Sequence, residues 1–206
     1  ADEIIRSDAD FVTLSEVRNY HDTRFCDRIV EALKKRGQTY YSFYTEDSGL
    51  LSRYPISDST TVYPLNDDRG SIYRLVTKMG GQEFAIYTAH LDYRNCAYYD
   101  ARGYDGNNWE KIERVNNLDS LLILNRASVR DDAIIRFVNE AEKDKAAGRI
   151  VILGGDFNEP SHLDWTEATK DMRDHYGLIV PWDVSVILEK AGYKDSYREK
   201  YPDPVT

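Results

Sequence analysis

The sequence has 206 residues, 41% hydrophobic and 31% charged, which is long enough for a substantial core and has the composition of a globular protein. Its net charge of -9 gives no general attraction to nucleic acid or to an anionic membrane, and no apolar run reaches membrane-spanning length. Two distant cysteines, Cys26 and Cys96, support neither a disulfide framework nor a thiolate zinc site. We expect a single domain over residues 1–206 and a monomer without a transmembrane segment; the cellular compartment stays open.

The first quarter of the chain predicts two helices and three strands. Residues 1–8 indicate part of a helix that leads into a strand over 11–17, with Glu16 near the end of the strand. Apolar residues at helical spacing predict a helix over 24–36, which Gly37 ends. Two antiparallel strands follow at 40–44 and 49–52, and Pro55 ends the second of them.

The middle of the chain predicts a β meander. Residues 59–64, 71–79 and 83–90 alternate in the manner of strands, and Gly80-Gly81 makes a hairpin connection between the last two. The third strand runs directly into His90. Residues 94–116 show no periodicity and predict a long irregular insertion of the kind that forms functional or mobile loops.

The last third predicts two further helices. One begins at about Arg126 or Asp131 and ends at Ala147, before Gly148; the other is short and covers residues 182–191. Residues 162–175 predict a polar connection that carries aromatic side chains. Residues 193–206 follow the last helix, and no strand is predicted after them.

The central stretch of the sequence is residues 149–161, Arg-Ile-Val-Ile-Leu-Gly-Gly-Asp-Phe-Asn-Glu-Pro-Ser. The short apolar run 150–153 predicts a strand in the middle of a sheet, covered on both faces. Two glycines then let the chain turn, and Asp156 and Asn158 emerge at the sheet's edge, where open α/β sheets usually bind ligands. Their oxygen donors suit Mg²⁺, although Asp and Asn are also common in ordinary turns.

Polar groups end three predicted strands: Glu16, His90, and Asp156 with Asn158. If the strands are neighbours, these side chains converge on one edge. A carboxylate could then hold a cation, a second carboxylate could orient or deprotonate water, and a protonated histidine and an amide could donate to a phosphate. Taken singly, His90 would more often be a hydrogen-bonded structural residue and Glu16 a solvated strand end.

Four segments carry a resemblance to the endonuclease/exonuclease/phosphatase superfamily, the deoxyribonuclease I-like proteins. Residues 14–17, Leu-Ser-Glu-Val, resemble its Leu-Gln-Glu-Val element, and residues 49–56, Gly-Leu-Leu-Ser-Arg-Tyr-Pro-Ile, are similar to its Ser-Arg-Tyr-Pro-Ile strand. Residues 88–91, Thr-Ala-His-Leu, resemble Thr-x-His-Leu, and residues 154–158 contain Gly-Asp-Phe-Asn. Order and spacing agree over nearly the whole chain.

The resemblance implies an α+β fold, a four-layered αββα sandwich of two mixed, mainly antiparallel sheets. By position, Glu16 would be the ligand of Mg²⁺ or Mn²⁺ and His90 would contact the scissile phosphate. Asp156 would orient or activate the attacking water, and Asn158 would bind phosphate beside it. Arg53 and Pro55 have a structural role in this interpretation. Pro55 ends an edge strand, and the guanidinium of Arg53 is exposed.

The sequence departs from the family pattern at both ends and at one internal position. It starts after the point where the family's first strand ends in a metal-binding Asn, and it holds no C-terminal Asp-His pair; His162 and His175 precede the place of that pair. Ser15 replaces the usual Gln. We therefore expect a domain truncated at both ends, with weak or absent activity.

The sequence favours a magnesium-dependent phosphoesterase acting on a small phosphorylated molecule, a sugar phosphate or a lipid headgroup. The acidic charge and the lack of a basic stripe disfavour nucleic acid, but a nuclease remains an alternative, since loop arginines and metal ions could serve a groove locally. Residues 94–125 and 162–165 would shape specificity. A third alternative is a non-catalytic module that binds carbohydrate or protein through its tyrosine and tryptophan side chains.

Overall fold

The computed structural model describes residues 1–18 and 23–205. The described chain divides into two compact units. The first unit comprises the described parts of Ala1–Leu91 together with Asn139–Asp156, and the second comprises Asp92–Val138 and the described residues from Phe157 onwards. The single domain over residues 1–206 stays a prediction.

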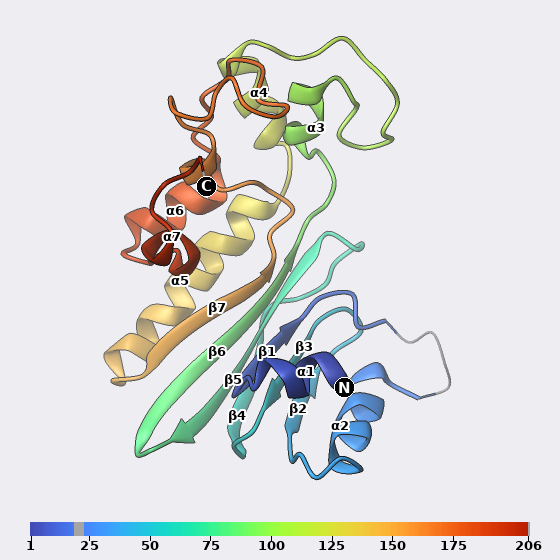
Figure 1. Cartoon of the computed structure of the whole chain (residues 1–206), viewed down its shortest axis with the longest axis vertical. Coiled ribbons are helices and arrows are strands. Elements are labelled where there is room, and N and C mark those ends of the chain that lie inside the picture. Colours follow the sequence, from blue (N-terminus) through green and yellow to red (C-terminus); the bar gives the residue numbers. More distant parts are fainter. Residues whose placement is uncertain (19–22, 206) are drawn as a thin grey trace. The chain divides into compact units, whose positions relative to one another are not determined.

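Two β-sheets form the first unit (Figure 1). The smaller sheet is antiparallel, with the order β1-β3-β2. The larger has the order β4-β5-β6-β7; its first three strands are antiparallel, and β7 runs parallel to β6. The strands are β1 (Phe11–Leu14), β2 (Tyr41–Tyr44), β3 (Gly49–Ser52), β4 (Ile56–Tyr63), β5 (Gly70–Met79), β6 (Gln82–Leu91) and β7 (Ile150–Asp156).

The core of the first unit lies between the two sheets. Leu50 of the small sheet packs with Tyr73, Leu75 and Ile86 of the large one, and all four are buried. Burial of one such side chain contributes about 1.5–3 kcal/mol, so this cluster holds the sheets together. Because side chains alternate along a strand, the residue next to Leu50, Leu51, points to the other face of the small sheet.

Helices cover the outer faces of both sheets. The amphipathic helix α2 (Phe25–Lys34) and the short α1 (Asp2–Ser7) pack apolar residues on the outer face of the small sheet, around Leu33, Tyr40 and Leu51. On the large sheet, the C-terminal part of α5 (Arg130–Ala146) places Asp144 against Arg74 and Tyr87 of adjacent strands. The first unit therefore has the predicted αββα layers and mainly antiparallel sheets.

A buried ion pair joins α5 to the large sheet. Asp144 accepts hydrogen bonds from Arg74 Nε at 2.7 Å, from the Tyr87 hydroxyl, and from Arg149 Nη1 at 3.0 Å. Burial alone would raise the pKa of the Asp144 carboxyl, but these donors together lower it. Removing one member of such a buried pair commonly costs about 3–5 kcal/mol, so this network fixes the helix on its sheet.

Two sequence expectations about the sheets are wrong. Among the described residues, β7 pairs with β6 alone and lies at the edge of its sheet, and Ile150 and Ile152 are 47% and 41% exposed. An apolar run predicts a strand but not its number of neighbours. The strand just before Arg53, β3, is the centre of its sheet rather than an edge, and the Arg53 guanidinium donates to Asp8 and to the Tyr40 hydroxyl.

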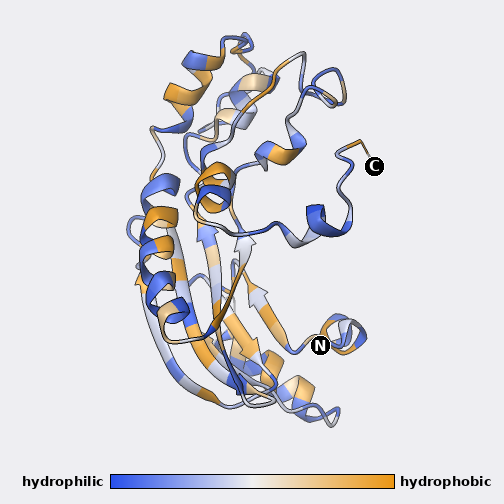
Figure 2. Cartoon of the chain, turned by 90° about the vertical axis from the view of Figure 1, so that its left-hand side faces the viewer, coloured by the Kyte–Doolittle hydropathy of each residue, from blue (hydrophilic) through white to orange (hydrophobic). Residues whose placement is uncertain are grey.

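The second unit is helical in its described part. Its core packs Trp165 and Trp182 against small and aliphatic side chains of other segments. The insertion at 94–116, expected to be irregular, contains a helix, and the segment from 193 onwards contains another. The helix α5, whose first part belongs here, carries both apolar and polar residues (Figure 2). The remaining elements are α3 (Ala97–Arg102), α4 (Leu118–Asn125), the 3₁₀ turn η1 (His162–Asp164), α6 (Asp183–Lys190) and α7 (Ser196–Lys200).

Both cysteines are buried and unbridged. Burial raises the pKa of the Cys26 thiol to about 12 and that of Cys96 to about 11. The Cys26 sulfur packs so closely on β3 that a Cβ at Gly49 would lie 2.6 Å from it. None of the helices in the described ranges combines the length and apolar character needed to cross a bilayer.

Candidate active site

Three strands of the first unit end beside one another. β6 and β7 are parallel and in register, with His90 opposite Asp156, so both side chains lie at the same end of the sheet. Ser15, after β1, connects this end to the small sheet: its hydroxyl donates to the Ala89 carbonyl at 3.4 Å and accepts from the Asp156 amide at 3.3 Å. Glu16 follows immediately. The convergence of Glu16, His90 and Asp156 predicted from their strands is present in the structure.

Two glycines of β7 make this close approach possible. A Cβ at Gly154 would lie 2.8 Å from the Thr13 hydroxyl, and a Cβ at Gly155 would lie 1.8 Å from the Ala89 carbonyl oxygen. Gly155 also has a φ of 144°, a conformation that side chains rarely adopt. The Gly-Gly pair therefore lets β7 pass close to β1 and β6 just before it presents Asp156.

The centre of this end is a buried Asp47–His90 pair. Asp47 Oδ2 lies 2.8 Å from His90 Nδ1 and accepts a second hydrogen bond from the Ser71 hydroxyl at 3.1 Å. Asp47 is 1% exposed and His90 6% exposed. The Nδ1 atom of His90 is therefore hydrogen-bonded to the Asp47 carboxylate. The Nε2 atom of His90 has no hydrogen-bond partner within residues 1–18 and 23–205. The pair fixes the ring and leaves Nε2 for a ligand.

The surrounding charges favour the protonated form of His90. The hydrogen bond to Asp47 raises the pKa of the imidazole and outweighs burial, which lowers it; the charges of Asp47, Asp156 and Glu16 raise it further. Burial alone would raise the pKa of Asp47, but its bonds with His90 and Ser71 and the charge of Arg18 together lower it. The pair is thus an imidazolium and a carboxylate over a widened pH range.

Carboxylates at this end fit a hard cation. Glu16 and Asp156 are exposed, and Glu16 has a φ of 57°, an uncommon conformation that is enriched at functional sites. In the buried pair, Asp47 Oδ1 has no hydrogen-bond partner among the described residues, with Arg18 Nε at 4.0 Å. Three carboxylates near one imidazolium leave negative charge for a cation to balance.

Mg²⁺ typically keeps several waters and takes one or two protein carboxylates, with substrate phosphate completing its shell. In the described ranges no group of three or more His, Cys, Asp or Glu side chains could hold a metal. Glu16, with Asp156 nearby, suits a Mg²⁺ ion that has one or two protein ligands rather than an ion coordinated entirely by protein side chains. The role of Glu16 as metal ligand stays a prediction.

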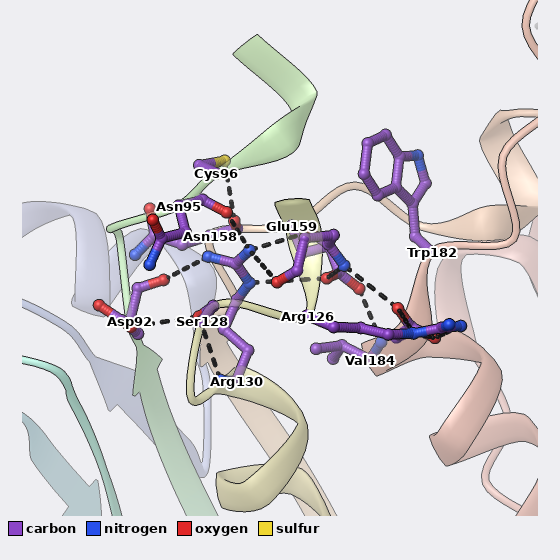
Figure 3. A network of polar contacts seen from close by, with 12 residues as sticks. Asp92, Asn95, Cys96, Arg126, Ser128, Arg130, Asn158, Glu159, Trp182 and Val184 are labelled. Atoms are coloured by element: carbon purple, nitrogen blue, oxygen red, sulfur yellow. Dashed lines mark hydrogen bonds and ion pairs between the residues drawn. The ribbon is translucent and has the colours of Figure 1, made fainter. Parts of the chain in front are cut away.

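Asn158 belongs to the second unit, where a buried polar network holds its loop (Figure 3). The Cys96 thiol donates to the Asn158 carbonyl, and the next residue, Glu159, accepts from Asn125 Nδ2 at 2.7 Å and from the Val184 amide at 2.6 Å. The position of Asn158 relative to Glu16, His90 and Asp156 stays a prediction.

Arg130 is the centre of this network. The side chain is fully buried; its guanidinium donates to the carbonyls of Asp92, Arg94 and Asn95, and its Nε lies 3.5 Å from Glu159 Oε2. Burial raises the pKa of Glu159 to about 7, while the Asn125 hydrogen bond and the Arg130 charge oppose that rise. Arg130 thus ties the start of the insertion to the loop that carries Asn158.

The sequence interpretation missed Asp47, Arg130 and Glu159. Asp47 lies in the turn between β2 and β3, 43 residues from His90, and nothing in the local pattern marks it as a partner. Arg130 begins a helix, where a charged residue is normally solvated. Glu159 offers the one usable signal, because it directly follows Asn158 in the central stretch.

We expect Asp47→Asn to lower the pKa of His90, because the largest contribution raising it is the hydrogen bond to Asp47. His90, with its raised pKa, stabilises the fold below the ordinary histidine value of 6.5, and this stabilisation is lost as the pH rises through its folded pKa. Asp47, with its lowered pKa, stabilises the fold above the ordinary value of 3.8, and this is lost as the pH falls through its folded pKa.

The effect of Asp47→Asn on stability should therefore be largest between the ordinary pKa values of 3.8 and 6.5. NMR titration of His90 and urea unfolding across pH measure both effects. Asp27→Asn, which removes a carboxylate bonded to the Tyr44 hydroxyl, is the control and should leave the His90 titration unchanged. An unaltered His90 titration in Asp47→Asn would show that the pair does not form.

The two layered sheets with helices on their outer faces have the architecture of the DNase I-like folds. The chain belongs to the Endonuclease/Exonuclease/phosphatase family, whose sequence profile matches residues 1–203. Members of this family are phosphoesterase hydrolases.

Individual relatives are distant. The chain is 27% identical over 164 residues to the uncharacterized protein F14F9.5 of Caenorhabditis elegans, a match that covers 78% of this chain and 47% of that protein. Among solved structures, D. rerio TDP2 complexed with single strand DNA product is similar with a TM-score of 0.49 and 15% identity, covering 95% of this chain and 56% of that one.

The human Nocturnin catalytic domain with bound sulfate anion gives a TM-score of 0.47 at 18% identity, over 76% of this chain and 54% of that one. The chain thus spans about half the length of the relatives it matches.

Proposed function

We propose that the protein is a metal-dependent phosphoesterase whose reaction occurs where β1, β6 and β7 end. The observation that carries this proposal is the buried Asp47–His90 pair beside the exposed carboxylates of Glu16 and Asp156. A purely structural histidine has no need of a free Nε2 next to two further carboxylates.

Each residue has a distinct role in this proposal. Glu16 holds Mg²⁺ or Mn²⁺, which when bound would neutralise negative charge growing on the phosphate oxygens. Asp47 keeps His90 protonated, and His90 Nε2–H donates to a phosphate oxygen in the transition state. Asp156 orients the attacking water and accepts its proton. Asn158 keeps its predicted role of binding phosphate.

The substrate we favour is a small phosphorylated molecule, a sugar phosphate or a lipid headgroup. The net charge of -9 repels a long polyanion unless cations intervene, and tight non-specific DNA binding depends on neutralising many phosphates. A nuclease acting on DNA or RNA is the alternative within the same chemistry. A non-catalytic binding module on this scaffold is the alternative outside it.

Metal removal should abolish turnover. We expect magnesium-dependent hydrolysis of bis-p-nitrophenyl phosphate or p-nitrophenyl phosphate by the full-length protein to stop in EDTA and to return when excess Mg²⁺ is added, because the phosphate charge then has no counterion. Comparison of the two compounds distinguishes diesterase from monoesterase activity. Turnover that persists unchanged in EDTA would contradict the metal requirement, and binding of sugars without turnover of any phosphoester would favour the non-catalytic module.

A further inference from the structure

The second unit contains a pocket that shares no residue with the candidate active site. Its volume is about 320 Å³, at the lower end of the range for small-molecule sites, which suits a ligand with one ring. The loop after β7, the turn around residues 169–175 and helix α7 contribute most of its lining.

Aromatic rings form one part of the lining. Trp165 is buried and stacks on His175 with ring centroids 4.0 Å apart, and Tyr98 meets Trp165 edge-on at 6.0 Å. Tyr197 of α7 also lines the pocket and is 56% exposed. Rings held by such contacts give a firm apolar surface against which the C–H face of a ligand ring can pack.

The charged residues of the lining leave one positive charge unmatched. Asp164 is paired with Arg198, whose Nε lies 2.8 Å from its Oδ1, and Asp174 is paired with Arg102 at 2.7 Å. Arg173 lines the same pocket but forms no hydrogen bond or ion pair with any residue in the described ranges. A guanidinium without a carboxylate is ready to bind a carboxylate or phosphate of a ligand.

Three other side chains of the pocket, His175, Asp164 and Asp174, can accept hydrogen bonds. His175 Nδ1 lies 2.9 Å from the Thr169 carbonyl, so Nδ1 carries the proton and donates, and Nε2 keeps its lone pair. Burial lowers the pKa of His175 and outweighs that hydrogen bond, and the charge of Arg173 lowers it further, which favours the neutral ring. The Asp164 and Asp174 carboxylates retain further acceptor capacity. Such acceptors match the hydroxyl donors of a ligand.

The backbone at this turn is uncommon as well. Arg173 and Tyr176 have φ values of 50° and 53°, in the left-handed region that costs a residue with a side chain about 1 kcal/mol or more. The Gly177 amide, bonded to the Lys170 carbonyl at 2.7 Å, helps to hold this turn. The conformation that places Arg173 at the pocket is therefore strained, and the rest of the fold must stabilise it.

We infer that this pocket binds a small hydroxylated ring that bears one anionic group, with Arg173 on the anion, His175 and the carboxylates on hydroxyls, and Tyr98 and Tyr197 against the ring. A sugar phosphate and a uronic acid share this chemistry. The inference does not depend on the proposed hydrolysis, because it concerns equilibrium binding by residues of the second unit alone.

Calorimetry in EDTA, where no metal-dependent turnover can occur, tests it on the full-length protein with glucose 6-phosphate, glucuronate, glucose and inorganic phosphate. We expect millimolar or tighter binding of glucose 6-phosphate or glucuronate, and which of the two binds identifies the anionic group. Arg173→Gln should weaken that binding about tenfold or more, whereas Arg136→Gln, at another exposed arginine of the second unit, should not.

NMR of His175 adds a readout that a merely structural role would not move. Ligand binding should raise the pKa of His175, because the anion offsets the charge of Arg173 that lowers it. The inference is overturned if none of the four compounds binds, if glucose or phosphate binds as tightly as the charged sugars, or if Arg173→Gln binds like the unaltered protein.

Discussion

Replacing His90 with alanine is expected to reduce kcat/KM for bis-p-nitrophenyl phosphate about 10³-fold, and Asp156→Ala should cause a loss of similar size. His90→Ala removes the imidazolium that Asp47 favours, and Asp156→Ala removes the carboxylate that we propose receives the proton of water. Steady-state kinetics of the full-length protein at saturating Mg²⁺ measures both losses.

The matched control is Asp27→Ala. Asp27 is also an exposed carboxylate of the first unit, bonded to the Tyr44 hydroxyl, but it belongs to helix α2 and has no proposed role in the reaction. Its kcat/KM should stay within about twofold of the unaltered protein. Circular dichroism must show that each variant is folded. Folded His90→Ala and Asp156→Ala proteins that retain full activity would refute the assignment of the site.

The largest expected loss of stability comes from Gly155→Ala, at least about 4 kcal/mol in the free energy of unfolding. Its new Cβ would meet the Ala89 carbonyl oxygen at 1.8 Å and the Ala89 nitrogen at 2.7 Å, all backbone atoms that can move only if β6 and β7 separate. The φ of 144° adds strain of its own. Urea unfolding followed by circular dichroism measures the difference.

Gly148→Ala separates steric conflict from backbone strain. Gly148 also has a positive φ, 78°, but a Cβ there would meet nothing within 4 Å. We expect a loss of about 1 kcal/mol at this position, from the left-handed conformation alone. If the two variants unfold at the same urea concentration, the close contact between β7 and Ala89 does not exist in solution.

The elements and the meeting of three strand ends were predictable because their signals are local. Apolar runs marked β6 and β7, Gly80-Gly81 marked the turn before β6, and Glu16, His90 and Asp156 lie at or just after the ends of such strands. Gly154-Gly155, expected to turn the chain, instead lie inside β7. The sequence placed His90 and Asp156 together only on the condition that their strands are neighbours, and the parallel, in-register pairing of β6 and β7 meets that condition.

What could not be predicted depends on contacts between distant segments. Asp47 looks like any polar turn residue until β3 and β6 lie in facing sheets and bring it to His90. Arg130 has the ordinary appearance of a charged helix start, but the carbonyls that surround it come from a segment some 35 residues earlier in the chain. The edge position of β7 is likewise a property of the assembled sheet, not of its own residues.

The burial of Cys26 and Cys96 has a practical consequence. Alkylation by maleimide or iodoacetamide requires an accessible thiolate, and at neutral pH thiols with pKa values of about 12 and 11 are almost entirely protonated. A fluorophore or spin label could therefore be attached at a newly introduced surface cysteine without first removing the natural ones. Paired labels, one in each unit, would then report interatomic separations in solution.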